Sequence, residues 1–416
     1  MYWLRKRFLK YRWRRIEAAW RRGERLTLPL KIPSAFITGS VGKTTTCRMV
    51  EHILASSGLR VAVSTTQGAF VGGERRRIGD SSSCRFASRL LLDRGVQAGV
   101  FELARGGLLR EGIAFDGCDV GAVLNVFDNH LGLGGIETRE QMAGVKAQVA
   151  RAARRLAVLN ADDPLCLAMR GQVRAPELCL VSMTADMPEL LTHMGAGGVG
   201  ACFDAARGEA RVVRGGEPVC SVPVAEIPAA LGGLFPPAIG NMLFAMAIAW
   251  GMGVDPRTIE AAIRTFASNE RSNPGRMNFY EGLPFRLLMT SCDGQEAMRE
   301  LALLAGRIDV PGRRLLLVYA MGDRPDAYIR GMSSVCAGVF DEYICTDAPL
   351  LRGREPLETA GLLAQGLLEA GVGEERITVA TDHDAALRAA FARAREGDLL
   401  VVQSFYSERA RELGLI

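Results

Sequence analysis

The stretch FITGSVGKTTTCRMVEHI, residues 36–53, limits the possible folds more than any other segment. Its apolar start is typical of a buried strand, and the residues after Gly42 have the apolar spacing of a helix. Between them, Gly39 and Gly42 let successive backbone N–H groups turn inward and bind an anion at the start of the helix. This order predicts a parallel α/β sheet with a phosphate site at the carboxyl edge.

The residues after the loop fit a nucleotide with a metal ion. Lys43 can reach the terminal phosphates, and Thr44, followed by Thr45, can place its hydroxyl on Mg²⁺. Only two residues separate the glycines, whereas a standard Walker A loop has four. The strand before and the helix after the loop favour a phosphate site over a chance match. Another glycine-rich stretch, GAGGVG at 195–200, lacks a clear preceding strand, and we interpret it as a turn.

Strand-like and helix-like segments alternate from residue 31 onward, which predicts a parallel sheet covered by helices. Residues 195–222 contain glycine turns and short alternating runs, which predict a β-hairpin addition. The polar stretch at 269–282 contains proline and glycine and is typical of a connection between domains. A further α/β alternation follows it.

We therefore predict an α/β protein with three parts. A basic helical arm occupies 1–30, a P-loop-type parallel-sheet nucleotide-binding domain 31–275, and a smaller Rossmann-like domain 276–416. The ten cysteines occur singly, without a C-x-x-C pair, so we expect buried free thiols. No apolar run reaches the roughly 18 residues of a membrane span and no secretory leader is evident, so we expect a cytoplasmic protein.

The positive charge is concentrated at the N-terminus. Residues 1–25 hold ten Arg and Lys against Glu17 and Glu24, whereas the formal net charge of the whole chain is only +5. The apolar residues of this arm, three tryptophans among them, can form one face of a helix. We favour docking on the body or on a partner subunit; contact with an anionic polymer ranks second, and contact with a membrane surface stays open. We expect no nucleic-acid partner, because no recognition motif follows.

Candidate metal ligands follow two further strand-like runs. Glu102 ends one run, and Asp128, Asn129 and His130 follow another. The carboxyl ends of parallel strands meet at one edge, where the phosphate loop also lies. Taken singly, each residue fits an ordinary loop, but oxygen ligands with one imidazole also suit Mg²⁺ bound with phosphates. Together with the phosphate loop they predict a metal–nucleotide site.

At this point the sequence resembles the Mur ligase superfamily, and most closely the Mur-ligase-like portion of cyanophycin synthetases. The resemblance covers roughly residues 33–402 and rests on blocks in the same order: TGSVGKTTT, FELARGGLLREGIAFDGCDVG, LNVFDNHLGLGGIET, GVKAQV, LNADDP, PGRMN, MGDRPDAYI, LRGREPLE and REGDLLVV. It implies an ATP-dependent ligase that phosphorylates a carboxylate, which an amine then attacks. We expect a stand-alone enzyme, because neither a UDP-binding domain nor an ATP-grasp half accompanies these blocks.

The resemblance also implies ATP and Mg²⁺ as cofactors and assigns roles to individual residues. Lys146 falls where the family has a carbamylated lysine that supports the metal ions; an ordinary surface lysine is the alternative. Two cations and an arginine would offset the repulsion between a carboxylate and the γ-phosphate. The implied phosphate and metal residues are Gly39, Gly42, Lys43, Thr44, Thr45, Glu102, His130 and Lys146, and the implied nucleotide residues are Asn160, Asp162, Asn241 and the linker residue Arg276.

In the C-terminal part, Arg352 and Arg354 flank a glycine after a predicted strand. The equivalent motif in relatives holds the carboxylate of the incoming amino acid, a task that suits guanidinium groups. A solvated charged loop is the alternative. Asp347 is a candidate for recognising a basic amine.

Two positions depart from the family pattern. The family DHL reads NHL here, with Asn129 in place of the aspartate, and the DYAHNP block is replaced by TSCDGQ at 290–295, where Asp293 is a candidate substitute. With these changes, the family pattern does not tell which amine is the substrate or whether the protein has full catalytic activity.

We predict an ADP-forming ligase that joins an amino acid or related amine to the carboxylate of a peptide, a poly-amino acid or a small molecule. The first alternative is a poly-γ-glutamate-type synthetase held at a membrane surface by its arm. The second is a structural or regulatory homologue that binds nucleotide without catalysis. A homo-oligomer and a partner ATP-grasp enzyme also stay open.

Overall fold

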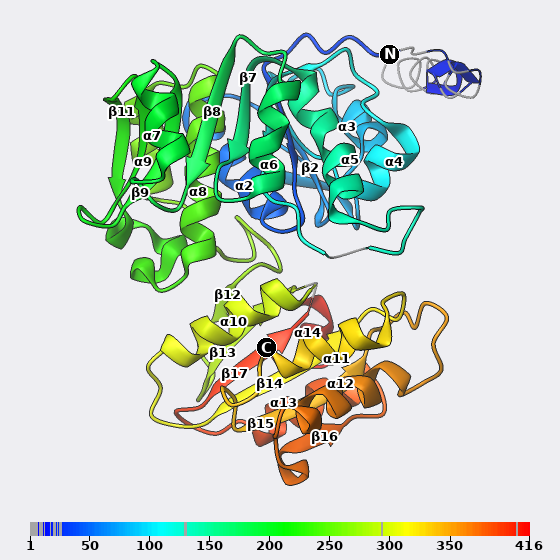
Figure 1. Cartoon of the computed structure of the whole chain (residues 1–416). Coiled ribbons are helices and arrows are strands. Elements are labelled where there is room, and N and C mark those ends of the chain that lie inside the picture. Colours follow the sequence, from blue (N-terminus) through cyan, green and yellow to red (C-terminus); the bar gives the residue numbers. More distant parts are fainter. Residues whose placement is uncertain are drawn as a thin grey trace. The chain divides into compact units, whose positions relative to one another are not determined.

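The computed structural model describes residues 7, 11, 13–16, 18–19, 22, 24, 27–128, 131–292, 294–404 and 407–416. They belong to two compact α/β units, Met1–Ala267 and Ser268–Ile416 (Figure 1). The polar stretch at 269–282, predicted to connect two domains, is the beginning of the second unit.

The described part of the first unit contains a mixed sheet with a parallel centre. The order is β11-β10-β9-β8-β7-β6-β1-β5-β2-β3-β4, so β1 lies between β6 and β5. The parallel strands are β9 (Val199–Asp204), β8 (Glu177–Ser182), β7 (Ala153–Asn160), β6 (Cys118–Val123), β1 (Ser34–Thr38), β5 (Ala98–Glu102) and β2 (Val61–Thr65). The carboxyl ends of these strands carry the loops described below.

Antiparallel strands extend the sheet at both ends. On one side, β10 (Glu209–Arg214) and β11 (Glu217–Pro223) pair antiparallel with β9 and with each other, which confirms the predicted hairpin addition. On the other, β3 (Gly68–Val71) and β4 (Glu74–Ile78) follow β2 in a meander that we did not predict. The Gly72–Gly73 pair between them is a hairpin signal that the sequence did contain.

Helices cover both faces of this sheet, so the unit has three layers. One face packs against α2 (Lys43–Ser56), α8 (Pro236–Gly251) and α9 (Pro256–Ile263). The other packs against α3 (Cys84–Leu90), α4 (Arg105–Glu111), α5 (Arg139–Ala152), α6 (Pro164–Ala168) and α7 (Pro188–Gly195). Short 3₁₀ helices η1 (Met169–Gln172), η2 (Val224–Glu226) and η3 (Pro228–Gly233) lie between these elements.

The second unit has its own parallel sheet, as predicted. The strand order is β12-β13-β17-β14-β15-β16, with only β12 antiparallel to its neighbour among the described strands. The strands are β12 (Asn278–Tyr280), β13 (Arg286–Thr290), β14 (Arg314–Ala320), β15 (Glu342–Asp347), β16 (Ile377–Val379) and β17 (Leu399–Gln403). The helices are α10 (Gln295–Arg307), α11 (Asp326–Ser334), α12 (Glu358–Glu369), η4 (Glu374–Arg376), α13 (His383–Arg393) and α14 (Glu408–Glu412).

Two further expectations concern the cysteines and the arm. All ten cysteines are buried and free, as predicted. In the arm, Trp13 and Ile16 are buried in the hydrophobic cluster that includes Leu28 and Leu30. This burial agrees with docking of the arm on the body, although much of residues 1–26 lies outside the described part. Among the described helices, none has the length and apolar composition of a membrane span.

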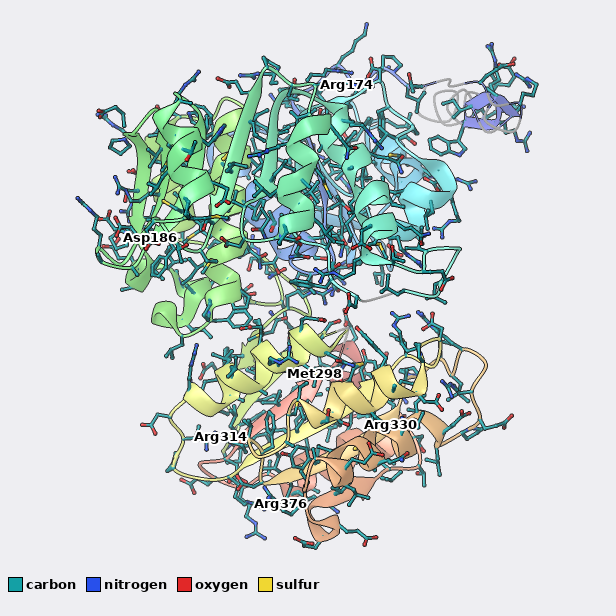
Figure 2. All side chains as sticks on the ribbon, viewed as in Figure 1. Arg174, Asp186, Met298, Arg314, Arg330 and Arg376 are labelled. Atoms are coloured by element: carbon teal, nitrogen blue, oxygen red, sulfur yellow. The ribbon has the colours of Figure 1, made fainter. Side chains whose placement is uncertain are left out.

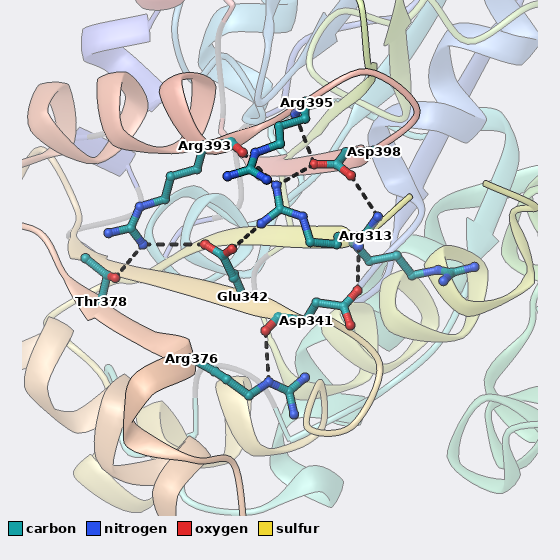
Figure 3. A network of polar contacts seen from close by, with 9 residues as sticks. Arg313, Asp341, Glu342, Arg376, Thr378, Arg393, Arg395 and Asp398 are labelled. Atoms are coloured by element: carbon teal, nitrogen blue, oxygen red, sulfur yellow. Dashed lines mark hydrogen bonds and ion pairs between the residues drawn. The ribbon is translucent and has the colours of Figure 1, made fainter. Parts of the chain in front are cut away.

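A network of charges fastens the amino ends of four strands in the second unit (Figure 3). Asp398, before β17, accepts hydrogen bonds from the guanidinium of Arg313 (2.8 Å) and from the backbone N–H groups of Arg313 (2.8 Å) and Arg395 (3.0 Å). Arg313 also pairs with Glu342, at the start of β15. Arg314 and Arg376, labelled in Figure 2, contact the neighbouring Asp341 through their backbone N–H and side chain respectively. The network lies at the edge opposite the loops that would hold ligands, so we assign it a structural role.

Replacing Arg313 by Met should lower the free energy of unfolding by about 1–3 kcal/mol at pH 7, because the buried Asp398 carboxylate loses its charged partner. Burial raises the pKa of Asp398, but its hydrogen bonds and Arg313 outweigh that effect and lower the pKa overall. Its stabilising effect is therefore complete above the unfolded pKa of about 3.9 and is lost as the pH falls further. Urea unfolding should show the difference between wild type and variant shrinking below pH ~4. A matched change at the exposed Arg388 should have little effect, and an equal loss there would contradict the assignment.

Candidate functional site

The loop between β1 and α2 requires glycine at both predicted positions. A Cβ on Gly39 would lie 2.9 Å from the Cβ of Leu124. Gly42 has φ +84°, and a Cβ there would lie 2.2 Å from Oδ1 of Asn241. Helix α2 begins directly after Gly42, so the N–H groups of its first turn open at the loop. The geometry is that of an anion-binding loop.

Asn125 holds this loop in shape, and sequence reasoning did not single it out. Its Oδ1 accepts hydrogen bonds from the backbone N–H of Ser40 (2.8 Å) and of Val41 (2.9 Å). Its Nδ2 donates to the carbonyl of Val41 (3.3 Å). The residue follows β6, beside β1, within the LNVFDNHL block, so its place after a strand was the available signal.

Thr44 and Glu102 meet at the carboxyl edge of the sheet. The hydroxyl of Thr44 donates to Oε2 of Glu102 (2.8 Å) and lies 3.0 Å from the hydroxyl of Thr66. The backbone N–H of Thr66 donates to the same carboxylate oxygen (3.1 Å). Glu102 is fully buried, and its Oε1 has no hydrogen-bond partner among the described residues. A buried carboxylate oxygen with an open lone pair beside a threonine hydroxyl fits a divalent cation.

The remaining metal ligand that the resemblance implies, His130, lies outside the described residues, as does Asn129. Within the described ranges, no three His, Cys, Asp or Glu side chains gather closely enough to hold a metal ion. Asp128 forms an ion pair with Arg139 at 3.3 Å and is largely exposed. Thr44 and Glu102 therefore supply only part of a metal site.

Lys146, on α5, is buried beside the phosphate loop, so the alternative of an ordinary surface lysine is wrong. Its Nζ lies 3.4 Å from the hydroxyl of Ser40. Burial is the main cause that lowers the pKa of Lys146 well below its usual range, and the positive charge of Lys43 lowers it further. The environment therefore favours a neutral amine.

The lysine content of the chain separates these two residues from all others. The 51 basic residues include only five lysines, Lys6, Lys10, Lys31, Lys43 and Lys146. Beyond residue 31, the sequence therefore has lysine only at the phosphate loop and beside it. Arginine cannot replace a compact ammonium group or a nucleophilic amine. The presence of lysine at these two positions, in a chain that otherwise uses arginine, is therefore a sequence signal for function that we did not use in the prediction.

Three predicted nucleotide residues lie around this site: Asn160 ends β7, Asp162 follows it in the next loop, and Asn241 lies on α8. Asn160 donates to the carbonyl of Leu124 (2.7 Å) and accepts from the backbone N–H of Asp162 (2.9 Å). Asp162 accepts from Ser182 (2.6 Å), and Asn241 accepts from Thr46 of α2 (3.3 Å). Lys43 donates to the carbonyl of Ser40 (2.8 Å), and Thr45 lies in the first turn of α2. The first unit thus brings together the described members of the predicted phosphate and nucleotide set, apart from Arg276.

Arg276 and the predicted amine-side residues belong to the second unit. The guanidinium of Arg352, a residue with φ +51°, pairs with Asp323 at 2.8 Å. Arg354 binds Asp326 (2.7 Å) and the carbonyls of Gly322 (3.0 Å) and Arg324 (2.8 Å). These contacts tie the loop after β14 to the loop between β15 and α12.

Asp347 has a structural task in the described conformation. Its Oδ1 accepts from the hydroxyl of Thr359 (2.6 Å) and the backbone N–H of Ala360 (3.0 Å), and its Oδ2 accepts from the backbone N–H of Leu357. The carboxylate thereby satisfies N–H groups at the start of α12. The other predicted substrate residue, Asp293, lies outside the described residues.

Gly42→Ala should abolish nucleotide binding, whereas Gly58→Ala should not. Both glycines have left-handed backbone angles, φ +84° and +80°, so each substitution strains the backbone by about 1–2 kcal/mol. Only at Gly42 would the new methyl group also collide, with Asn241; around Gly58 no atom lies within 4 Å. Calorimetric titration with a non-hydrolysable ATP analogue measures the difference. Equal binding by the two variants would contradict the proposed loop geometry.

The sequence matches two domain families in order. Residues 37–193 match the Mur ligase middle domain, and residues 275–404 match the Mur ligase, glutamate ligase domain. The first match contains the phosphate loop, Glu102 and Lys146, and the second contains Arg276, Asp347, Arg352 and Arg354.

Curated relatives agree with this assignment. The chain is 35% identical to the cyanophycin synthetase of Synechocystis sp. over 387 residues, which cover 92% of this chain and 44% of that protein. It is 37% identical to the cyanophycin synthetase of Crocosphaera subtropica over 345 residues, 82% of this chain and 39% of the relative. The chain thus spans less than half the length of these relatives.

Solved structures share the fold. E. coli FolC in complex with DHPP and ADP aligns with a TM-score of 0.66 at 18% identity, over 92% of this chain and 88% of that one. The bifunctional folylpolyglutamate synthase/dihydrofolate synthase from Yersinia pestis, complexed with AMPPNP and a Mn ion, aligns with a TM-score of 0.65 at 20% identity, with the same coverage. With both domain families matched in order and a fold shared with these structures, the chain belongs to the Mur ligase family.

Proposed function

We propose that this protein is an ATP-dependent, ADP-forming ligase that activates a carboxylate as an acyl phosphate and joins it to an amine. The observation that carries the proposal is the arrangement at the phosphate loop. The fully buried Glu102 keeps one oxygen without a hydrogen-bond partner among the described residues, beside the hydroxyl of Thr44, and the buried Lys146 lies 3.4 Å from the loop residue Ser40. Neither feature stabilises a fold by itself.

Each described residue has a task in this reaction. The loop from Gly39 to Gly42 and the first turn of α2 would bind the phosphates, and Lys43 would offset the charge that develops on the transferred phosphoryl group. Thr44 and Glu102, with His130 and Lys146, would hold the divalent cation, for which we propose Mg²⁺. The cation, when bound, neutralises phosphate charge as the acceptor carboxylate approaches.

The amine side of the reaction is assigned to the second unit. Arg352 and Arg354 would bind the carboxylate of the incoming amino acid, which requires them to exchange Asp323 and Asp326 for substrate. Asp347 and Asp293 stay proposed substrate residues. For Asp347, this role also requires that its present hydrogen bonds at the start of α12 be exchanged for substrate. Arg276 keeps its proposed role toward ATP.

The acceptor that fits these features is a peptide, a poly-amino acid or a small carboxylate, and the incoming partner is an amino acid or related amine. A cytoplasmic location, a homo-oligomer, a partner ATP-grasp enzyme and membrane contact by the arm stay proposals of the sequence. No observation on the described residues favours the poly-γ-glutamate-type or the non-catalytic alternative over the ligase.

The purified protein should release ADP and phosphate when it is given Mg²⁺, ATP, short Asp- or Glu-rich peptides and a pool of amino acids. Mass spectrometry of the same mixture should show a peptide mass gain equal to an amino acid minus water. Lys43→Met should reduce this turnover at least ~100-fold, because the charge on the phosphates is no longer offset. Lys31→Met, at an exposed lysine outside the loop, should leave it unchanged. ATP binding without a mass gain across the panel would favour the non-catalytic alternative.

Lys146 should carry a carbamate. A buried amine that favours its neutral form can attack CO₂ and release a proton, and the resulting carbamate would bear the negative charge that a metal site needs. Carbon-13 NMR of the protein in labelled bicarbonate should show a carbamate signal that disappears in Lys146→Arg and persists in Lys31→Met. A signal that survives in Lys146→Arg would place the modification on another amine and remove this role.

A further inference from the structure

Strained backbone gathers near the arginines to which a ligand is assigned. Among the described residues, the non-glycine positions with a left-handed φ are Leu231 (+52°), Met277 (+52°), Arg352 (+51°) and Leu357 (+68°). Met277 directly follows Arg276, and the two others in the second unit are Arg352 itself and a residue three positions after Arg354. A side chain with a Cβ makes this conformation unfavourable, so it persists only where surrounding contacts enforce it. Met277 therefore indicates that the turn around Arg276 is held in place.

Asn278 holds this turn with one side chain. Its Oδ1 accepts a hydrogen bond from the backbone N–H of Gly275 (2.8 Å), and its Nδ2 donates to the carbonyls of Arg276 (2.9 Å) and Asn273 (3.1 Å). The residue is 1% exposed and begins β12, which pairs with β13. It ends the PGRMN block, in which the resemblance gave a role to Arg276 alone. Asn278 thus binds the backbone on both sides of the Arg276 side chain.

Neighbouring residues add to this restraint. The backbone N–H of Met277 donates to the hydroxyl of Thr290 (3.2 Å), at the end of β13. The hydroxyl of Ser268 donates to the carbonyl of Arg276 (2.6 Å), and the backbone N–H of Arg276 donates to the carbonyl of Asn273 (3.2 Å). Every backbone N–H from 275 to 277 therefore has a partner. Together these contacts fix the direction in which the Arg276 side chain leaves the turn.

The phosphate loop is held in the same way. There, the side chain of Asn125 accepts from the N–H groups of Ser40 and Val41 and donates to the carbonyl of Val41. In both places one Asn side chain both accepts from and donates to the backbone of a loop. A segment that only connected two units would gain nothing from a strained residue, because a relaxed turn would serve equally well.

We propose that Asn278 is a positioning residue for Arg276, which holds the turn 275–277 against the strain at Met277 and so directs the guanidinium before ATP binds. This inference rests on the proposed ligase function, in which Arg276 acts toward ATP. Positioning matters because a side chain that must first be ordered during the reaction loses part of its effect to conformational entropy. The strain also makes a specific test possible, because a glycine at position 277 should make Asn278 less necessary.

The first test needs no ATP. In the ligand-free protein, Asn278→Ala should speed hydrogen exchange of the amides from 275 to 277 at least about tenfold, because the turn opens more often. Adding Met277→Gly should slow the exchange again at least about threefold, since glycine adopts a left-handed φ without strain. Mass spectrometry of peptides that cover this turn measures both effects. Exchange that is unchanged in Asn278→Ala, or not slowed in the double variant, would overturn the proposal.

The second test follows ADP release in the mixture of peptides and amino acids described above while the ATP concentration is varied. Asn278→Ala should lower kcat/KM for ATP at least about tenfold, and Met277→Gly should restore at least about threefold of it. In an Arg276→Met background, Asn278→Ala should have no further effect, because a positioning residue acts only through the residue that it positions. A further fall in that background would show a merely structural role and would overturn the proposal.

Controls separate loss of positioning from loss of stability. Arg313→Met weakens the other edge of the same sheet, so it should lower the melting temperature and leave kcat/KM for ATP unchanged. Should Asn278→Ala fail to fold, Thr290→Val removes only the partner of the Met277 N–H. It should cause a smaller loss that Met277→Gly again reverses, and no loss would overturn the proposal.

Two outcomes distinguish this proposal from the ligase function. If Arg276→Met releases ADP as fast as the wild type, the positioning role is overturned while the ligase function stands. If the wild type releases no ADP, the ligase function fails, and hydrogen exchange still decides whether Asn278 holds the turn.

Discussion

The hydrogen bonds that meet at Glu102 are the constraint on which the rest of the site depends. One carboxylate oxygen joins three segments, because it accepts from Thr44 at the start of α2 and from Thr66 in the turn after β2, while Glu102 itself ends β5. A buried carboxylate is unfavourable unless it is bonded or paired. The fold satisfies only half of this one. The bonded oxygen brings the phosphate loop and the β2–β3 turn together, and the unsatisfied oxygen is the one that would suit a cation.

The phosphate loop shows how packing and backbone conformation combine. Gly39 lies against Leu124, and Gly42 lies against Asn241 with a left-handed backbone. Asn125 then uses one side-chain oxygen to hold two consecutive N–H groups of the loop. The strands that carry these partners are adjacent, since β6 pairs with β1. The shape of the loop is therefore a property of the sheet as much as of the loop sequence.

The two units use charge differently. At the amino edge of the second sheet, Arg313 and its carboxylate partners satisfy one another and need no ligand. Around Lys146 and Glu102 in the first unit, like charges and unsatisfied oxygens are left together. Natural folds retain such unfavourable groups mainly where function requires them. The contrast within one chain supports a structural role for the Arg313 network in the second unit. It supports a functional role for the groups around Lys146 and Glu102 in the first unit.

Local sequence was enough for the alternation of strands and helices, the division into two α/β parts, the loop at 39–42 and the placing of Glu102 at a strand end, because each depends on residues close together in the chain. The β3–β4 meander was missed although its glycine turn was visible. Which groups are satisfied could not be predicted, because it depends on partners far apart in sequence: 58 positions separate Thr44 from Glu102, 85 separate Ser40 from Asn125, and 106 separate Ser40 from Lys146. Only the tertiary structure decided that Lys146 is buried, that Asn125 holds the loop, that Asp347 accepts hydrogen bonds from the start of α12 and that Oε1 of Gln67 has no hydrogen-bond partner among the described residues. Burial and hydrogen bonding are set by what the folded chain brings into contact.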